Sequence, residues 1–278
     1  MSYQLSQEQR ESFEKDGFLV LRDVLSESET KDVQQWAQEV HDWPISPESP
    51  WMPYEEVNAS GKRVLCRTEN YANYHDGFNG FLRGKRLRGV LAQLSGEPMN
   101  LFKEKINYKL AGSGGFAPHI DSPAYRQIKD IKHLTILLAV DSANMSNGGL
   151  EAVRGSHNMK VPLGDDLCIP SDWIQSHEWT PIDLEPGQLL IFGSYLAHRS
   201  GANRSDTDRK ALYATYNRAS EGDLHDDYYE HRAKNWPATH MRKPDEDYAE
   251  GQLLYGYGSP MLSVVTGKQL VFEGDVRG

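Results

Sequence analysis

His119 and Asp121 are separated by one residue in the segment Phe116-Ala117-Pro118-His119-Ile120-Asp121. On a β-strand, side chains two residues apart point to the same face, so this spacing predicts an imidazole and a carboxylate side by side. A second histidine from a distant strand, His198, would complete a set of two imidazoles and one carboxylate. Such a set, with open positions opposite, is the facial triad of non-haem Fe(II) oxygenases. The three residues are therefore candidate metal ligands and candidate catalytic residues.

The surroundings of the pair decide its interpretation, because the chain has ten histidines and a chance His-x-Asp is unsurprising. A glycine-rich turn, residues 112–115, precedes the pair and can deliver a strand to a site. His198 follows the apolar segment 188–192, which is typical of a strand. His225, His231 and His240 lie in a late segment rich in charge, where we expect solvated surface rather than ligands.

The elements that must position these residues are predicted to be mainly β. After residue 98, short strand-like segments alternate with Gly, Pro, Asn and Asp clusters; they cover residues 100–110, 135–140, 149–153, 188–192 and 209–217. Such a series favours an all-β barrel or sandwich. We expect one domain over residues 1–278, with a helical flank and substrate loops (1–97), a β core holding the metal site (98–220) and a C-terminal extension (221–278).

Three helices are predicted in the flank. Ser6 and Gln9 have the spacing of a capping box for a helix that ends near Lys15, before Gly17. A serine at position 26 or 28 is expected to cap a second helix, and residues 78–95 have the periodicity of a third. Residues 221–249 are dense in charged and polar side chains, which indicates a surface segment.

Charge and composition exclude several classes of function. The net charge of −10 and the pI near 5.5 argue against broad binding to nucleic acid or anionic membranes. Two cysteines make no disulfide framework, residues 1–14 lack an apolar signal core, and no apolar run approaches the length of a membrane helix. We expect a cytoplasmic protein with a small-molecule partner; the sequence carries no signal for an oligomeric state.

The spacing of the candidate residues resembles the phytanoyl-CoA hydroxylase superfamily of Fe(II)/2-oxoglutarate-dependent dioxygenases. Members have a His-x-Asp motif, then a distal histidine, a hydroxyl residue two positions later and an arginine eleven positions after that histidine. The pair at 119 and 121, His198, Ser200 and Arg209 stand at these positions. Residues 13–21 match the start of the family, and residues 147–157 resemble its Asn-Gly-x-Leu-x-Val-x-Pro-Gly-Ser-His segment, with Ala152 and Arg154 in place of Val and Pro.

The resemblance implies a double-stranded β-helix (jelly-roll or cupin-like) core with flanking N-terminal helices. It implies Fe(II) on the triad, 2-oxoglutarate and O2 as cosubstrates, and a far carboxylate bound by Arg209 with Ser200. The implied reaction is hydroxylation of a small organic molecule, with release of succinate and CO2. Desaturation, epoxidation or ring formation in natural-product biosynthesis, a cupin-like metal isomerase, and a silent binder are the alternatives.

Two further residues are candidates for binding the cosubstrate. Thr135 lies on a predicted strand and is a candidate to face 2-oxoglutarate, although an ordinary strand threonine is equally consistent with the sequence. Asn107 and Lys109 alternate with Lys105 on another predicted strand and could face the cavity. A charge exposed on an edge strand is the alternative for these lysines.

Substrate-binding groups are expected on loops around the mouth of the barrel. The candidates are Tyr71, Tyr125, Arg126 and Asn217. The stretch 67–71, Arg-Thr-Glu-Asn-Tyr, is similar to family members that act on small molecules, such as bacterial 2-aminoethylphosphonate dioxygenase and fungal enzymes of secondary metabolism. An aromatic rim suits an organic molecule, whereas Arg126 would suit an anionic group.

Overall fold

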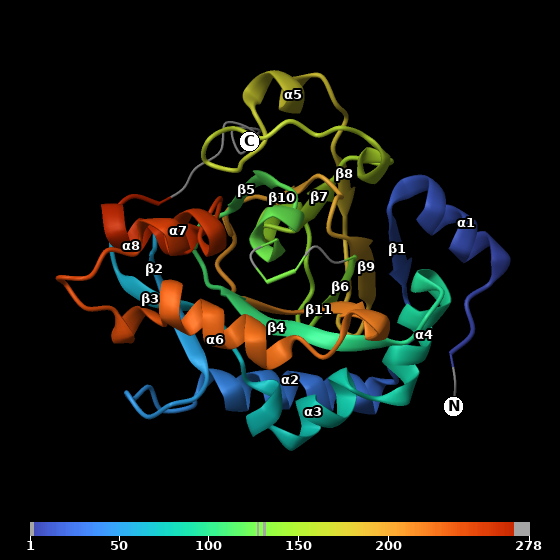
Figure 1. Ribbon diagram of the computed structural model, residues 1–278, viewed down its shortest axis with the longest axis horizontal. Coiled ribbons are helices and arrows are strands. Elements are labelled where there is room, and N and C mark those ends of the chain that lie inside the picture. The colour runs from blue at the N-terminus through green and yellow to red at the C-terminus, as the bar shows by residue number, and fades with distance from the viewer. Residues whose placement is uncertain (1–2, 127, 130–131, 270–278) are drawn as a thin grey trace.

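Two antiparallel sheets form the centre of the protein in a computed structural model that describes residues 3–126, 128–129 and 132–269 (Figure 1). The seven-stranded sheet has the order β1-β9-β6-β11-β4-β3-β2, and the four-stranded sheet has the order β5-β10-β7-β8. The strands are β1 (Phe18–Leu21), β2 (Met52–Val57), β3 (Arg63–Glu69), β4 (Met99–Lys109), β5 (Phe116–His119), β6 (His133–Ala139), β7 (Leu150–Ala152), β8 (Thr180–Ile182), β9 (Leu189–Gly193), β10 (His198–Ser200) and β11 (Arg209–Arg218).

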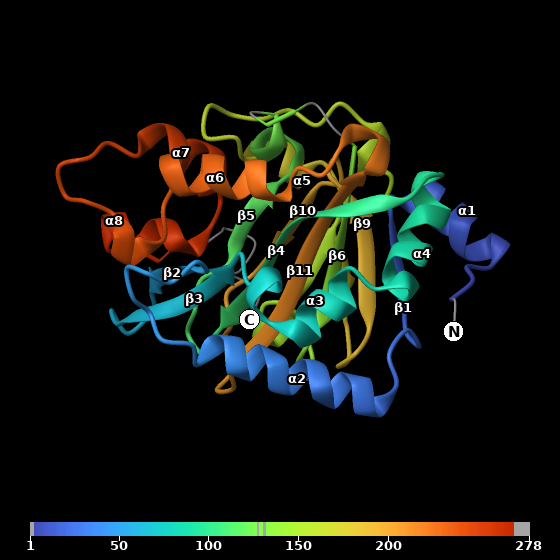
Figure 2. The ribbon, with the colours of Figure 1, turned by 60° about the horizontal axis from the view of Figure 1, so that its bottom comes forward.

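Helices cover the outer face of the large sheet and one end of the barrel (Figures 1 and 2). They are α1 (Gln7–Asp16), α2 (Glu27–His41), α3 (Asp76–Leu82), α4 (Lys85–Ser95), α5 (Ser171–Gln175), α6 (His225–Asn235), α7 (Ala249–Tyr255) and α8 (Ser263–Thr266), with short 3-10 turns between them. Apolar residues of α2, α3 and α4 pack on the outward-facing residues of β4, β6, β9 and β11 in one continuous core. A separate apolar cluster, which includes Phe18, Leu137 and Leu190, fills the space between the two sheets at one end.

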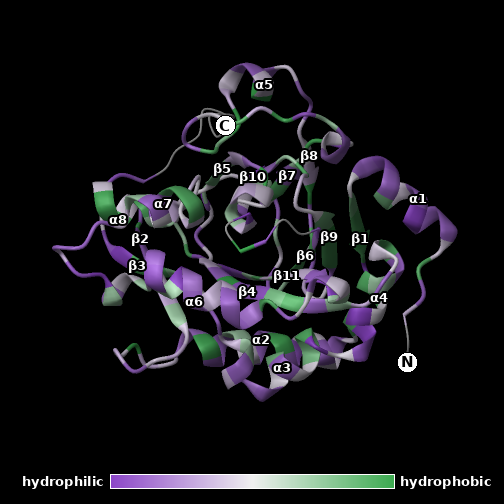
Figure 3. Cartoon of the chain, viewed as in Figure 1, coloured by the Kyte–Doolittle hydropathy of each residue, from purple (hydrophilic) through white to green (hydrophobic). Residues whose placement is uncertain are grey.

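This arrangement confirms the expected mainly β, double-stranded β-helix fold with helices from the first hundred residues. The strongest local predictions are confirmed as well. Ser6 and Gln9 form the capping box of α1, and Gly17 ends it at a φ of 82°, a conformation that glycine adopts without strain. Hydropathy follows the same division, since β1 and β9 are hydrophobic whereas α1 is largely hydrophilic (Figure 3).

The predicted helix over residues 78–95 is in fact two helices. Gly84 separates α3 from α4 and has an extended backbone, with φ −68° and ψ 149°. A Cβ atom at this position would lie 2.6 Å from the carbonyl oxygen of Gly80, so the turn needs glycine. The apolar periodicity continues across the break, which is why the sequence does not reveal it.

The expectation of a surface segment over residues 221–249 is wrong for α6. His225, Tyr228, Tyr229 and Arg232 of this helix are buried. The charged members are buried in pairs: His225 Nε2 lies 2.9 Å from Glu104 Oε2, and Arg232 Nη2 donates to Glu69 Oε1 at 2.9 Å. Pairing removes the main reason for which such side chains stay in water.

Within residues 3–126, 128–129 and 132–269, every helix is too short or too polar to span a lipid bilayer.

Candidate metal centre and active site

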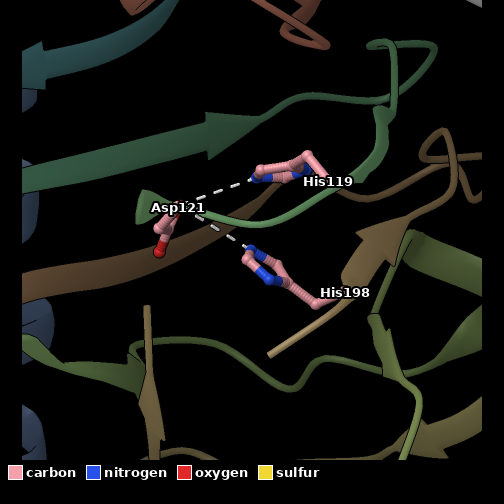
Figure 4. Close-up of side chains that lie close together, drawn as sticks. All are labelled: His119, Asp121 and His198. Carbon is pink, nitrogen blue, oxygen red and sulfur yellow. Dashed lines mark ion pairs between the residues drawn. The ribbon is translucent and has the colours of Figure 1, made fainter. Parts of the chain in front are cut away.

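The three predicted metal ligands meet where β5 and β10 pair. His119 is the last residue of β5, His198 is the first of β10, and the two are register partners in the antiparallel pair. Their rings lie 4.2 Å apart between centroids. Asp121 comes from the turn after β5 and points toward both imidazoles (Figure 4). Two residues that are 79 positions apart in the chain are therefore joined by strand pairing.

The reason for the position of Asp121 differs from the one that its spacing suggests. Strand β5 ends at His119, and Asp121 has φ −77° and ψ −25°, at the start of the 3-10 turn Ser122–Tyr125. The carboxylate reaches the metal site through this turn rather than through the alternation of a strand.

Backbone carbonyls hold both imidazoles in the orientation that a metal needs. His119 Nδ1 lies 2.5 Å from the carbonyl oxygen of Ala117, and His198 Nδ1 lies 2.9 Å from that of Leu196. Each Nδ1–H therefore donates to the backbone, which leaves each Nε2 available as a metal ligand, with Nε2 to Asp121 Oδ1 distances of 3.7 and 4.0 Å.

The charges of the three groups also fit a divalent cation. Burial, with the neighbouring His198, lowers the pKa of His119 to about 3, so this imidazole is neutral. Burial alone would raise the pKa of Asp121, but His198, His119 and Lys103 lower it to about 2. One ligand atom from each residue lies within 4.8 Å of the others, and no other such group of ligating residues exists in the described part of the chain. Two imidazole nitrogens and one carboxylate oxygen suit Fe(II) and leave open positions.

Arg209, Ser200 and Lys109 form a second polar cluster. Arg209 begins β11, opposite Lys109 at the end of β4. Its Nε donates to the carbonyl oxygen of Asn147 at 2.9 Å, and its Nη2 donates to that of Gly148. Lys109 Nζ donates to Ser200 Oγ at 3.0 Å and to the Gly148 carbonyl at 3.1 Å. The cluster thus holds two buried cations and one hydroxyl, a set that suits a carboxylate.

The other two predicted cosubstrate residues lie on strands of the large sheet. Thr135 on β6 pairs with Thr215 on β11, their hydroxyl oxygens 3.0 Å apart. Asn107 on β4 accepts a hydrogen bond from Arg67 Nε at 3.0 Å. Both side chains are buried, and β4 lies inside the sheet rather than at its edge.

The pocket beside the triad is lined by a set of residues different from the predicted substrate residues. Tyr71 is buried in the core between the large sheet and the helices, and Arg126 is exposed. Tyr125 packs against Phe102 and His133, and the amide of Asn217 donates to the carbonyls of Arg218 and Gly222. The described residues that line the pocket are Arg67, Lys103, Lys105, Phe116, His119, Asp121, Ala124, Tyr228, Arg232, Leu254, Tyr255, Tyr257 and Ser259.

Cations dominate this pocket. Lys103 and Lys105 alternate on β4, and neither ammonium group makes a hydrogen bond or an ion pair with any residue of the described ranges. The nearest partners of the two Nζ atoms are the rings of Tyr125 and Tyr213, with 4.6 and 4.9 Å to the ring centroids. Burial lowers the pKa of Lys103 to about 8, and it lowers that of Lys105 well below its usual range. Isolated buried ammonium groups are costly, which makes them candidates for binding an anion.

The guanidinium of Arg67 is oriented by the chain and leaves one nitrogen available. Its Nε donates to Asn107, and its Nη1 donates to Glu69 Oε1 at 3.0 Å. Arg232 from α6 donates to the same Glu69 oxygen, so one buried carboxylate connects two guanidiniums. Nη2 of Arg67 has no acceptor among the described residues. The sequence signal for this site is the alternation of Lys103, Lys105 and Lys109 on one strand. Lys105 and Lys109 were predicted from it, whereas Lys103 and Arg232 were missed.

The chain is similar to known proteins over most of its length. A sequence model of the phytanoyl-CoA dioxygenase family matches residues 13–211. The 2-aminoethylphosphonate dioxygenase of an uncultured bacterium (HF130_AEPn_1) is 38% identical over 263 residues, which is 94% of this chain and 100% of the relative. The methylphosphonate hydroxylase of Gimesia maris is 36% identical over 237 residues, covering 85% and 90% of the two chains. The crystal structure of EctD from S. alaskensis with 2-oxoglutarate and 5-hydroxyectoine superimposes with a TM-score of 0.69 at 19% identity, over 92% of this chain and 85% of that one.

Proposed function

Because this chain belongs to the phytanoyl-CoA dioxygenase family and is an Fe(II)/2-oxoglutarate-dependent dioxygenase of small organic molecules, we propose that its substrate is a small organophosphonate. The reaction is hydroxylation at a carbon of that substrate. The phosphonate group is bound by the cations of the pocket beside the triad.

The buried lysines carry this proposal. Lys103 and Lys105 line the pocket that also contains His119 and Asp121, and no carboxylate of the described residues forms an ion pair with either ammonium group. Together with Nη2 of Arg67 they offer three donors to one anion. A phosphonate has three oxygens and up to two negative charges, so it satisfies all three donors, whereas a neutral substrate would leave them buried without partners.

The names of two relatives support the same substrate class. Both are named for a phosphonate, and both extend over most of this chain. Aromatic and apolar side chains form another part of the lining, with Phe116, Tyr228, Leu254 and Tyr255 among them. In this proposal these side chains contact the carbon chain of the substrate.

We assign the metal to His119, Asp121 and His198, and the far carboxylate of 2-oxoglutarate to Arg209, Ser200 and Lys109. Bound Fe(II) and 2-oxoglutarate supply the oxidising chemistry with O2, and 2-oxoglutarate leaves as succinate and CO2. The protein holds the carbon to be oxidised beside the metal by fixing the phosphonate on Arg67, Lys103 and Lys105. Asn107 contributes indirectly in this assignment, since it orients Arg67. The hydroxyl of Thr135 contacts that of Thr215 on the neighbouring strand.

The proposal includes the late segment in the same catalytic domain. Tyr228 and Arg232 on α6 and the residues at 254, 255, 257 and 259 line the pocket, which supports a contribution of this segment to the active site. We also propose a cytoplasmic location for this protein, without nucleic-acid or membrane partners, because its net charge is −10.

Succinate formation tests the function. Anaerobically iron-loaded protein is given 2-oxoglutarate and then O2, with 2-aminoethylphosphonate, methylphosphonate, taurine (the sulfonate isostere of the first) or ethylamine. We expect succinate to rise with at least one phosphonate, less with taurine, and not with ethylamine, and we expect phosphorus NMR to detect a hydroxylated product. Stimulation by none of the phosphonates, with iron shown to be bound, would contradict the substrate class. Absence of succinate under every condition would favour the isomerase or silent-binder alternative.

Arg209→Ala is expected to raise the KM for 2-oxoglutarate by about 100-fold, since truncating one partner of a buried charge pair costs about 2–5 kcal/mol. The KM for the phosphonate should change little, because Arg209 is absent from the residues lining that pocket. Initial rates over a 2-oxoglutarate titration measure the effect. Arg204→Ala, an exposed arginine five positions earlier, is the matched control. An unaltered 2-oxoglutarate titration would remove Arg209 from the site.

A further inference from the structure

The turn that carries Asp121 needs support from outside its own strand. Because β5 ends at His119, the carboxylate of Asp121 depends on the conformation of residues 120–122. One support within the barrel is a hydrogen bond from the Ser122 amide to the carbonyl oxygen of Ser194, at 3.0 Å. A second support comes from residues 257–258.

Residues 257–258 run along β5, the edge strand of the small sheet. The amide of Ala117 donates to the carbonyl oxygen of Gly258 at 2.7 Å, so this strap satisfies part of the edge that carries His119. Gly258 has a φ of 63°, and a Cβ atom there would lie 3.0 Å from the Cβ of Ala117. The close approach of the strap to β5 therefore requires glycine.

Tyr257 contacts the backbone between the two ligands that this strand provides. Its hydroxyl donates to the carbonyl oxygen of Ile120 at 2.9 Å and lies 3.4 Å from that of Asp121. Its ring meets the imidazole of His119 edge to face, with 5.7 Å between centroids. Burial and the nearby charge of Asp121 raise the pKa of Tyr257 well above its usual range, so the hydroxyl remains a donor.

We propose that Tyr257 is a positioning residue of the metal centre, which fixes the Ile120–Asp121 peptide and the ring of His119. The inference rests on the proposed metal ligands and adds to them a residue of the C-terminal segment, beyond residues 13–211 that match the family model. The Tyr257 hydroxyl restrains the turn that carries Asp121, which lies beyond the end of β5. Without it, the carboxylate samples orientations that no longer converge with the two Nε2 atoms, and the affinity for the metal falls.

The test compares Tyr257→Phe with Tyr216→Phe. Tyr216 also donates a buried hydroxyl to a backbone carbonyl, that of Leu82 at 2.8 Å, but it lies in the core of the large sheet and the helices, away from the metal ligands. Mn(II) serves as the probe, and its dissociation constant is measured by titration of the free-ion EPR signal without 2-oxoglutarate or substrate. Thermal unfolding shows that each variant is folded.

We expect Tyr257→Phe to weaken Mn(II) binding by about 3- to 10-fold, the range of one net hydrogen bond, and Tyr216→Phe to leave it unchanged. Gly258→Ala, which displaces the same strap, is expected to weaken it as well. Equal Mn(II) affinity of Tyr257→Phe and the wild type would overturn the inference, and so would equal weakening in both tyrosine variants. A wild-type protein that binds no Mn(II) would overturn the assignment of the metal ligands themselves. If the wild type binds Mn(II) and Tyr257→Phe binds it equally well, only the inference about Tyr257 fails.

Discussion

Replacing Asp121 by alanine is expected to lower succinate formation by more than about 100-fold. Removing a residue that only orients a metal ligand lowers metal affinity or activity by about 10- to 100-fold. Asp121 is itself a ligand and the sole anionic member of the triad, so its removal should cost more. His119→Ala should have a comparable effect, because it removes one of two nitrogens that face the carboxylate. Succinate formation under saturating iron, together with the Mn(II) dissociation constant, measures both variants.

The fold should survive this substitution. Asp121 has a pKa lowered to about 2, so its ionised form contributes stability that is present above its unfolded pKa near 4 and is lost as the pH falls toward 2. At neutral pH the variant lacks this contribution, and we expect a lower Tm but a cooperative transition. Asp206→Ala, at an exposed position, is the control for an unspecific loss of charge. Unchanged succinate formation in Asp121→Ala would remove this residue from the metal site.

The β core could be predicted because its signals are local. The segment 209–217 becomes β11, Arg209–Arg218, and its alternation places Arg209 on one face and Lys210 on the other. Spacing in the chain also predicted that His119, Asp121 and His198 would meet, since resemblance to a family carries long-range geometry that a single strand does not. The physical premise for Asp121 was nevertheless wrong, because a turn and not a strand places it.

The lining of the pocket beside the triad could not be predicted in the same way. Tyr71 was selected for its place in a loop-like stretch, yet it is buried in the core. Arg232 and His225 were assigned to the surface because charged residues are usually exposed, and only the folded chain shows that Glu69 and Glu104 receive them. A buried ion pair joins residues far apart in sequence and leaves no periodicity to read.

Lys103→Met is expected to raise the KM for the phosphonate by about 100-fold and also to stabilise the fold. The loss of affinity follows from removing one of the three donors to the anion, at about 2–5 kcal/mol for a buried charged partner. Stability should rise because burial lowers the pKa of Lys103 to about 8, which shows that the folded state disfavours its charge at neutral pH. Methionine keeps the length of the side chain without that charge. A gain of stability with a loss of binding is typical of a residue retained for function.

Lys210→Met is the matched control, since Lys210 lies on the opposite face of the neighbouring strand β11 and pairs with Asp141, at 3.7 Å. It should leave the KM for the phosphonate unchanged. An unaltered KM in Lys103→Met would show that the phosphonate binds elsewhere, and the phosphonate assignment of this pocket would fail.

The pH dependence of kcat/KM distinguishes a lost charge from a lost shape, because kcat/KM reports the pKa values of the free enzyme. Lys103 is protonated below about pH 8 and binds the anion, so wild-type kcat/KM for the phosphonate should fall as the pH rises through about 8. The Lys103→Met variant should lack this step and keep its low value across the range. Titration of Lys103 should also change the stability of the wild type relative to the variant, but in the opposite direction to kcat/KM. Between pH 8 and its unfolded pKa near 10.4, the unfolded wild type binds more protons than the folded form, so wild-type stability rises with pH toward that of the variant. A step in kcat/KM that persists in the variant would assign it to another group.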